Sequence, residues 1–351
     1  MTGLTRGSAA IVGAAESDLG QVADGLSVFD LMGQGVRRAL DDCGLSLKDV
    51  DGLFSATTQS RMSVLGLAEY LGINPPFLGS TIVGGSSFEY HVAQAIGAIE
   101  LGLCNVAVIA YGSTQRSVGR KQASVREPNP YETPFKPFLP SSAYAMAASR
   151  HMHQYGTTRE QLAAVAVAAR EWALLNPKAW EKKPLSIADV LNARMVSYPL
   201  SVRDCCLVTD GGGAIIMTSA ERARSLKKKP VYVLGCGQST THANITSMPD
   251  LTVTGALTSG KAAYDMAKLG PSDVDVIQLQ DTDAGAEITL ASPAGGAAHQ
   301  PQLLDAGLVD RHADRLAGRP AGHVDPLRLR QRRQERQAPG RPANHRQLLC
   351  R

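Results

Sequence analysis

Residues 83–102 read VGGSSFEYHVAQAIGAIELG, and they join a glycine-rich turn to a helix. The apolar residues before the turn predict a buried strand, the pattern after it predicts a helix over residues 89–101, and Gly102 can end that helix. A second apolar strand is expected at residues 106–110. Backbone N–H groups at such a turn lie at a helix N-terminus, where they can bind an anion or a reaction oxyanion. The turn is therefore the first candidate site.

The chain on either side of this stretch contains strand–helix–strand units. A strand at residues 9–13, a helix at residues 27–42 and a strand beginning at Asp49 form the first unit. Residues 230–277 repeat this order, beginning with a strand at residues 230–235, and each copy carries an Asp-Val-Asp segment before its final strand. An internal duplication accounts for the repeat. Two α/β halves, each with a central sheet covered by helices, are therefore predicted.

A helical insertion lies between the two halves. It combines a polar loop at residues 115–140 with helices at residues 141–155 and 157–173, the second of which begins with a capping-box pattern at Thr157 and Glu160. We expect four parts: a first half (1–114 and 200–225), an inserted domain (115–199), a partial second half (226–283) and a tail (284–351).

The tail differs in composition from the rest of the chain. No aromatic residue follows Tyr264, and from about residue 284 the sequence is rich in Ala, Gly, Pro, Gln and Arg without hydrophobic periodicity. Such a segment cannot build a packed core. It is either a disordered basic tail or the product of a GC-rich gene read out of frame, and we favour the second interpretation.

The overall composition excludes several classes of protein. The chain has 351 residues, of which 44% are hydrophobic, enough for a large core. The formal net charge is only +4, which argues against a dedicated nucleic-acid binder. We expect neither a membrane span, which needs ~20 apolar residues, nor a secretory leader. The six cysteines show no metal-ligand spacing, so we predict reduced thiols, no metal site and a cytoplasmic location.

Several segments together resemble one known group of proteins. The most specific is YGTTREQLA at residues 155–163, and others lie at residues 84–87, 144–153, 204–211, 248–255 and 273–275. Over residues 7–281 the chain resembles the sterol-carrier-protein-type thiolases, in particular the cysteine-free "lipid-transfer protein" branch of the thiolase superfamily. The resemblance implies the thiolase fold, an α/β fold of duplicated halves in a layered αβαβα arrangement with an inserted helical loop domain.

The chain departs from the family pattern at two places. The family carries a nucleophilic cysteine in the glycine turn, where this sequence has Gly85, or Ser86 if the register shifts by one. After Asp275 the family continues with a Tyr- or His-Asp-aromatic segment and then His-Pro-Gly and Cys-x-Gly segments, of which only Asp281 has a counterpart here.

The resemblance implies a coenzyme A thioester as substrate, with no bound cofactor. The expected reaction is carbon–carbon bond cleavage or formation, of thiolase or retro-aldolase type, on a bulky acyl-CoA of lipid, steroid or aromatic-acid metabolism. A retro-aldol cleavage needs a base and a polarised thioester carbonyl but no acyl-enzyme, so it suits a site without the cysteine.

The candidate catalytic residues are those at the turn and the one matched family position: Gly85, Ser86, Ser87, His91 and Asp281. Gly85 would offer its backbone N–H group to an oxyanion. The two serines are nucleophiles on one interpretation and helix caps on the other. His91 would face the site or, alternatively, have a structural role.

The candidate residues for binding coenzyme A lie in the insertion. Arg116, Arg120 and Lys121 could contact its phosphates, although such a run of charges can also be simply solvated. His151 and His153 could line a pocket of the inserted domain, or lie on a solvated helix face.

Two rival functions and two partners remain open. The chain could be a non-catalytic CoA- or lipid-binding subunit, or an inactive truncated homologue. It could also be an ordinary thiolase that uses Cys205 or Cys206, which are otherwise buried thiols. The resemblance implies a homodimer, with the strand at residues 106–110 near the two-fold interface, and a small OB-fold, zinc-ribbon partner subunit.

Overall fold

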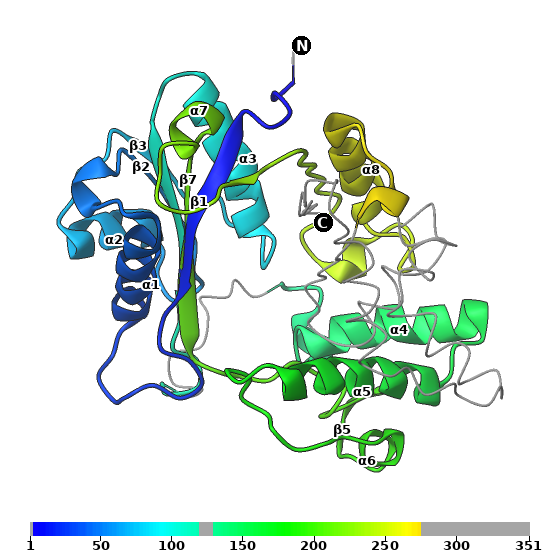
Figure 1. The fold of residues 1–351 in the computed structure, drawn as a ribbon. Coiled ribbons are helices and arrows are strands. Elements are labelled where there is room, and N and C mark those ends of the chain that lie inside the picture. Colours follow the sequence, from blue (N-terminus) through cyan, green and yellow to red (C-terminus); the bar gives the residue numbers. More distant parts are fainter. Residues whose placement is uncertain (1–2, 119–128, 275–351) are drawn as a thin grey trace, which may run out of the picture.

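The computed structural model describes residues 3–118 and 129–274 of the chain. Within these residues, a mixed six-stranded sheet forms the core (Figure 1), in the order β3-β2-β4-β7-β1-β8. β2 runs parallel to β3 and β4, whereas β7 is antiparallel to β4 and β1, and β8 is antiparallel to β1. The strands are β1 (Ala9–Glu16), β2 (Gly52–Ser55), β3 (Phe77–Gly79), β4 (Val106–Ser113), β7 (Gly211–Ser219) and β8 (Val231–Tyr232).

Helices cover both faces of this sheet. α1 and α2 pack on one face and α3 on the other, and α4, α5 and α6 build the insertion with a short hairpin of β5 and β6 (Figure 1). The bounds are α1 (Val28–Cys43), α2 (Ser63–Leu71), α3 (Ser87–Glu100), α4 (Ser141–Tyr155), α5 (Arg159–Leu175), α6 (Ile187–Leu191), α7 (Ala220–Ala223), α8 (Ala256–Ala267), β5 (Met195–Ser197) and β6 (Leu200–Ser201). The predicted α/β class is confirmed, and among the described residues no helix is both long and apolar enough to cross a membrane.

The sequence of α1 explains both of its ends. Ser27 and Asp30 form a capping box, in which the Asp30 carboxylate accepts from the Ser27 N–H at 2.7 Å. Gly44 adopts a left-handed conformation with φ of 77°, which only glycine takes readily, and closes the last turn. Both features agree with the prediction.

The strand β4 lies in the middle of the sheet and divides its side chains between two hydrophobic clusters. Val106, Val108 and Ala110 pack under α1 and α2, whereas Ala107 and Ile109 pack under α3. Because neighbouring side chains of a strand point to opposite faces, a continuous apolar run is what a strand covered on both sides requires. β2 and β7 occupy both edges of β4, so within the described residues the open edges of the sheet belong to β3 and β8.

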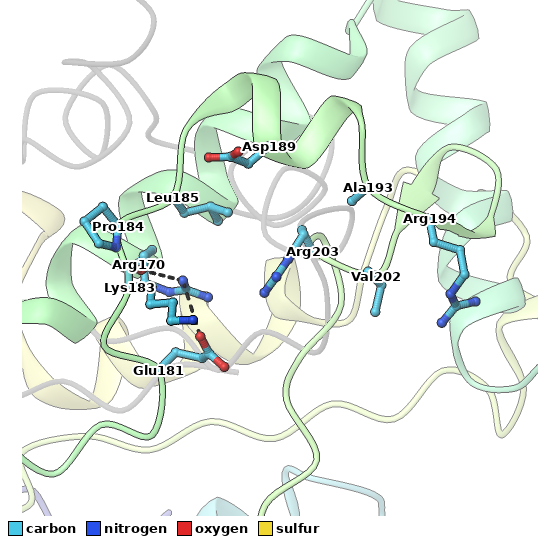
Figure 2. A pocket seen from close by; sticks show the side chains of 10 residues that line it. All are labelled: Arg170, Glu181, Lys183, Pro184, Leu185, Asp189, Ala193, Arg194, Val202 and Arg203. Atoms are coloured by element: carbon cyan, nitrogen blue, oxygen red, sulfur yellow. Dashed lines mark hydrogen bonds and ion pairs between the residues drawn. The ribbon is translucent and has the colours of Figure 1, made fainter.

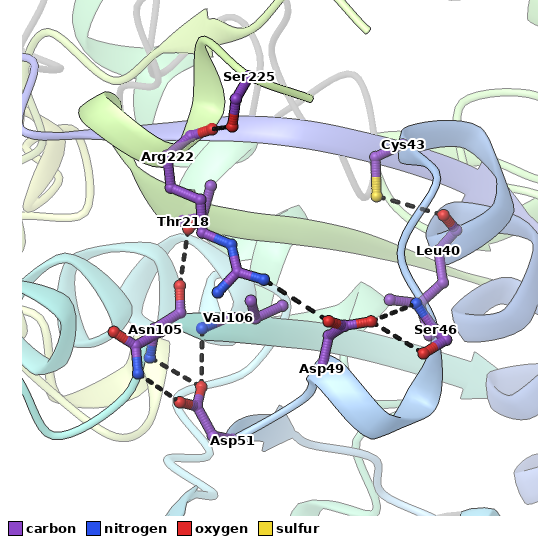
Figure 3. A network of polar contacts seen from close by, with 10 residues as sticks. All are labelled: Leu40, Cys43, Ser46, Asp49, Asp51, Asn105, Val106, Thr218, Arg222 and Ser225. Atoms are coloured by element: carbon purple, nitrogen blue, oxygen red, sulfur yellow. Dashed lines mark hydrogen bonds and ion pairs between the residues drawn. The ribbon is translucent and has the colours of Figure 1, made fainter. Parts of the chain in front are cut away.

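The first Asp-Val-Asp segment anchors the beginning of β4 (Figure 3). Asp51 accepts hydrogen bonds from the backbone N–H groups of Asn105 and Val106, both at 2.7 Å. Asp49 caps a short turn and lies 3.6 Å from Arg222, which follows β7. These carboxylates therefore connect three chain segments that lie far apart in sequence.

Three predicted elements need correction. The buried strand expected directly before the glycine turn is absent, because β3 ends at Gly79 and the side chains of Ile82 and Val83 are exposed. The N-cap of α5 lies one residue later than expected, because Thr158 and Gln161 form the capping box instead of Thr157 and Glu160, and the helix runs over Arg159–Leu175 instead of residues 157–173. The Thr157 hydroxyl bonds to a ring nitrogen of His151 instead. The strand expected at residues 230–235 is only two residues long, because only Val231 and Tyr232 pair with β1. The strand expected at the end of the second repeat and the whole tail lie outside the described residues, so the proposed domain boundaries stay a prediction.

Candidate functional site

The glycine turn, residues 83–87, lies at the N-terminus of the 14-residue helix α3. Gly84 has φ of 82°, and a Cβ built on it would meet no atom within 4 Å. Gly84 and Gly85 are exposed, and Ser86 occupies the N-cap position without making a side-chain cap hydrogen bond. The turn therefore places exposed backbone at the positive end of a helix dipole, as the sequence predicted.

Ser87 stabilises the turn from inside. Its buried hydroxyl donates to the Gly84 carbonyl oxygen at 2.6 Å and accepts from the Val83 N–H at 3.0 Å. Because the hydroxyl is engaged in both directions, Ser87 holds the turn in shape, although it is the first residue of the helix and not its cap. Its predicted catalytic role is not supported by this geometry.

His91 lies beneath the turn, between α3 and the sheet. Its side chain is fully buried, and its ring stacks obliquely on Phe54 and edge-on against Phe88, with centroid separations of 5.8 and 5.9 Å. Nε2 lies 3.1 Å from the Thr81 carbonyl oxygen, which can only accept, so Nε2 carries the proton. Burial lowers the pKa of His91 to about 4. The ring is therefore neutral near pH 7 and supports the loop that leads into the turn.

The predicted coenzyme A residues are spread over the molecule. Arg116 stacks its guanidinium 4.5 Å above the Trp180 ring and donates to the Val208 carbonyl oxygen at 3.1 Å. His151 is buried, and burial lowers its pKa, whereas His153 is exposed. The structure does not bring these three side chains together in the pocket described below. Arg120, Lys121 and Asp281 lie outside the described residues.

Asp210 explains why Arg116 is fixed in its position. The carboxylate is buried and accepts from the backbone N–H groups of Val22, Arg116 and Ser117 and from the Ser117 hydroxyl. Burial acts to raise the pKa of Asp210, but these hydrogen bonds outweigh it and hold the pKa below its usual value. The carboxylate therefore connects the end of β4 to the beginning of β7.

A second site, which the sequence did not reveal, lies in the inserted domain (Figure 2). This cavity of about 410 Å³, called here the arginine pocket, has the size of a small-molecule site. Its lining combines four cations and two acids with apolar side chains: Arg170, Glu181, Lys183, Pro184, Leu185, Asp189, Ala193, Arg194, Val202 and Arg203. The four cations are scattered over residues 170–203, so no local cluster of charge marks the pocket in the sequence.

The two acids of the arginine pocket are already engaged. Glu181 lies 3.7 Å from Arg170, and Asp189 accepts from the backbone N–H and the hydroxyl of Ser186 at 2.9 and 2.6 Å. These bonds from Ser186 hold the pKa of Asp189 below its usual value. Among the described residues, no acidic group lies within 4.0 Å of the charged ends of the other three cations, Lys183, Arg194 and Arg203. The pocket therefore carries an excess of positive charge suited to a phosphate group.

The described cysteines do not supply a thiol to the turn. Cys43 and Cys104 are buried in the core, and Cys236 lies against Met266 of α8; burial raises the pKa of all three, that of Cys104 to about 11. Cys205 packs near Leu200 in the insertion, and Cys206 is exposed. No cluster of three potential metal ligands occurs within residues 3–118 and 129–274.

Comparisons with known proteins give a consistent result. A family described as thiolase C-terminal domain-like matches residues 237–299. The chain is 32% identical over 299 residues to a steroid side-chain-cleaving aldolase of Thermomonospora curvata, which covers 78% of this chain and 74% of that protein. It is 33% identical over 297 residues to a 17-hydroxy-3-oxo-4-pregnene-20-carboxyl-CoA lyase of Mycobacterium tuberculosis, covering 78% and 75%.

The fold is also similar to that of a solved structure. The structure of an Ltp2-ChsH2(DUF35) aldolase superposes with a TM-score of 0.73 at 30% identity, and the match covers 89% of this chain and 81% of that one. The similarity therefore extends over sequence, fold and most of the length of both chains.

Proposed function

The chain belongs to the thiolase superfamily, in its thiolase-like lipid-transfer branch, and from that premise we propose that it breaks a carbon–carbon bond in a bulky acyl-CoA. The thiolase fold predicted from the sequence is confirmed by the same comparisons. One observation carries the proposal: two relatives that share about a third of their residues with this chain over most of their length are an aldolase and a CoA lyase.

The geometry of the turn supports an aldolase more than a thiolase. In a retro-aldol cleavage, a base removes the proton of a β-hydroxyl, the Cα–Cβ bond breaks, and its electrons form the enolate of the thioester. The enolate carbon then takes up a proton, so no acyl group is ever transferred to the protein. The exposed N–H groups at the turn can stabilise the enolate oxygen, and the absence of a thiol there does not hinder this step.

The arginine pocket supports an acyl-CoA as the substrate class. Coenzyme A carries three phosphate groups, and Arg194 and Arg203 present planar guanidinium groups that suit phosphate oxygens. Leu185 and Val202 add apolar surface next to these charges, on which a nucleotide base can pack. We propose that this pocket holds the phosphorylated end of the substrate, in addition to or instead of the loop cations named from the sequence.

We also propose a homodimer, a small OB-fold partner subunit and a cytoplasmic location. The open edge of β3, with exposed Leu78 and the nearby exposed Ile82 and Val83, supports a strand-pairing interface. β4 itself is paired on both sides, so the interface expected near residues 106–110 would have to be formed by other elements. The Ltp2-ChsH2 relative supports the partner subunit, and the free cysteines support a reducing compartment.

A single assay separates cleavage from its rivals. The purified protein is incubated with β-hydroxyacyl-CoAs that carry bulky acyl groups, with and without the OB-fold partner, and the ketone and the shortened acyl-CoA are measured. An aldolase releases both without free coenzyme A, whereas a thiolase acts on a 3-oxoacyl-CoA and requires free coenzyme A. Tight binding without any product would contradict the proposal and favour a binding subunit.

The remaining alternative is tested on the same samples. If Cys205 or Cys206 were a nucleophile, iodoacetamide would label it and abolish thiolysis. Labelling of exposed Cys206 with no loss of ketone release is the expected result, because a retro-aldol step needs no thiolate.

A further inference from the structure

Residues 176–183, called here the strap, run from the end of α5 to the arginine pocket and contact the core on the way. Lys178 Nζ lies 2.6 Å from the Glu16 carboxylate at the end of β1. Lys182 folds back and donates to the carbonyl oxygens of Asn176 and Pro177 at 2.7 and 2.9 Å. The strap is therefore held in a defined conformation and attached to the sheet.

Trp180, at the middle of the strap, is partly exposed and lies between Arg116 and Gly20. The Arg116 guanidinium lies 4.5 Å from the ring centroid on one side. On another side is Gly20, where an added Cβ would come within 2.4 Å of the Trp180 ring. Gly20 also has φ of 96°, which disfavours any other residue. The indole therefore occupies the space that a side chain at position 20 would need.

Hydrogen bonds hold both walls of the seat, Gly20 and Arg116, in place. Gly20 exchanges two backbone hydrogen bonds with Asp210, at 2.9 and 2.8 Å. Asp210 also accepts from the Arg116 backbone N–H at 2.8 Å, and the Arg116 side chain is tied to the Val208 carbonyl oxygen. Both walls of the seat are thus hydrogen-bonded to the same residue, Asp210, which lies between β4 and β7: Gly20 to its backbone and Arg116 to its carboxylate.

The other end of the strap forms part of the arginine pocket. Arg170 donates to the Lys183 carbonyl oxygen at 2.7 Å and lies 3.7 Å from Glu181, and all three residues line the pocket (Figure 2). Trp180 immediately precedes Glu181. A displacement of the indole would therefore act directly on Glu181 in the pocket wall.

We propose that Trp180 is a positioning residue for the reaction: its seat between Gly20 and Arg116 fixes the arginine pocket relative to the sheet that carries the glycine turn. This inference rests on the proposed function, in which the pocket holds the phosphates while the turn receives the thioester oxygen. Binding the phosphates needs only the pocket, whereas presenting the thioester to the turn also needs the seat. A reactant misplaced by about 1 Å can lose on the order of 100-fold in rate.

The test uses two glycines of the same loop as a matched pair. Gly20→Ala introduces a methyl group that displaces the indole, whereas Gly25→Ala has a similar positive φ of 89° and no atom within 4 Å of the added Cβ. Both changes carry comparable backbone strain, but only the first disturbs Trp180. Trp180→Phe and Trp180→Ala, made separately, keep and remove a ring in the seat. All variants are also made with Trp172→Phe, so that fluorescence reports Trp180 alone.

Three quantities are measured on the full chain: the affinity for coenzyme A by calorimetry, the emission of Trp180 with and without coenzyme A, and kcat and KM for the acyl-CoA. We expect Gly20→Ala and Trp180→Ala to bind coenzyme A within about threefold of the parent but to lose at least about tenfold in kcat. Trp180→Phe should recover most of kcat, and Gly25→Ala should match the parent.

The emission experiment does not depend on turnover. Coenzyme A should change Trp180 emission in the parent and in Gly25→Ala but not in Gly20→Ala, in which the indole has left its seat. If coenzyme A binds without changing the parent's emission, or if both glycine variants retain the parent's kcat, the inference is wrong. If the parent cleaves no acyl-CoA but shows the expected emission changes, the proposed reaction fails while the link between pocket and sheet stands.

Discussion

The glycine turn and the arginine pocket are held in shape by different kinds of interaction. The turn rests on neutral hydrogen bonds from Ser87 and His91 and on the packed side chains of Phe54 and Phe88. The pocket is built from long charged side chains at the surface, ordered by ion pairs such as that of Arg170 with Glu181. The turn is thus supported by the packed core, whereas the pocket is formed by charged side chains that suit an anion.

The largest expected effect concerns the core beneath the turn. Phe54 is fully buried and contacts both Phe77 and His91, so Phe54→Ala should lower the free energy of unfolding by about 3–5 kcal/mol. Leu185→Ala in the pocket, where the side chain is only partly buried, should cost less than about 2 kcal/mol. Denaturant unfolding of both variants measures the difference, and equal losses would contradict it.

The next effect is a pH dependence of the free energy of unfolding that originates at His91, beneath the turn. The pKa of His91 falls from 6.5 to about 4 on folding, so the unfolded chain binds the proton more tightly. The contribution of the neutral buried ring is complete above pH 6.5 and is lost as the pH falls towards 4, on the order of 3 kcal/mol in all.

His91→Gln provides the control for this pH dependence. Glutamine keeps a donor for the Thr81 carbonyl oxygen but does not titrate, so the variant should lose less stability than the parent between pH 6.5 and 4. Chemical unfolding at several pH values measures the two curves, and parallel curves would show that His91 does not titrate in this range.

A smaller effect is expected at Ser87. Ser87→Ala removes the hydroxyl that bridges the Val83 N–H and the Gly84 carbonyl oxygen and should destabilise the protein by about 1–3 kcal/mol. The turn should also loosen, so kcat should fall more than the affinity for coenzyme A. Ser225→Ala, which removes only an exposed hydrogen bond to the Arg222 carbonyl oxygen, serves as the control and should have a smaller effect on both quantities.

The smallest expected effect concerns the charge of the pocket. Arg203→Gln should weaken coenzyme A binding by about 5- to 15-fold, because a charge-assisted hydrogen bond contributes about 1–1.5 kcal/mol at an exposed site. Salt should weaken binding to the parent more than to the variant. Arg224→Gln, on an exposed arginine after α7, is the matched control and should bind as the parent does. Identical salt dependence in all three proteins would place the phosphates elsewhere.

Features of this fold are predictable from the sequence where the interactions that decide them are local. α1 was predicted with both ends, because Ser27, Asp30 and Gly44 act within a few residues of each other. The strand at residues 230–235 was overestimated, because only Val231 and Tyr232 pair with β1 and this long-range pairing is not encoded in the local sequence. The capping box of α5 was misplaced by one residue, since two adjacent threonines fit the pattern almost equally well.

The same distinction between local and long-range interactions separates the two candidate sites. The glycine turn is contiguous in sequence and was found there. The arginine pocket was missed, because α5, the strap, α6 and the β5–β6 hairpin each contribute isolated residues to it. The burial of His91 could have been anticipated from its place on the apolar side of α3 with Ala95 and Ala98, but its bond to Thr81 needed the fold.

The pairing of β8 with β1 links the N-terminal segment of the chain to residues that follow position 230. Gly7 donates to the Val233 carbonyl oxygen, Val233 donates to Ala9, and the Arg6 side chain reaches the Ala267 carbonyl oxygen at the end of α8. Residues 6–9 thus form hydrogen bonds with residues beyond position 230. A protease nick in the exposed lysine-rich link at residues 227–229 should therefore leave two fragments that copurify, and separately expressed fragments divided there should reassemble when mixed.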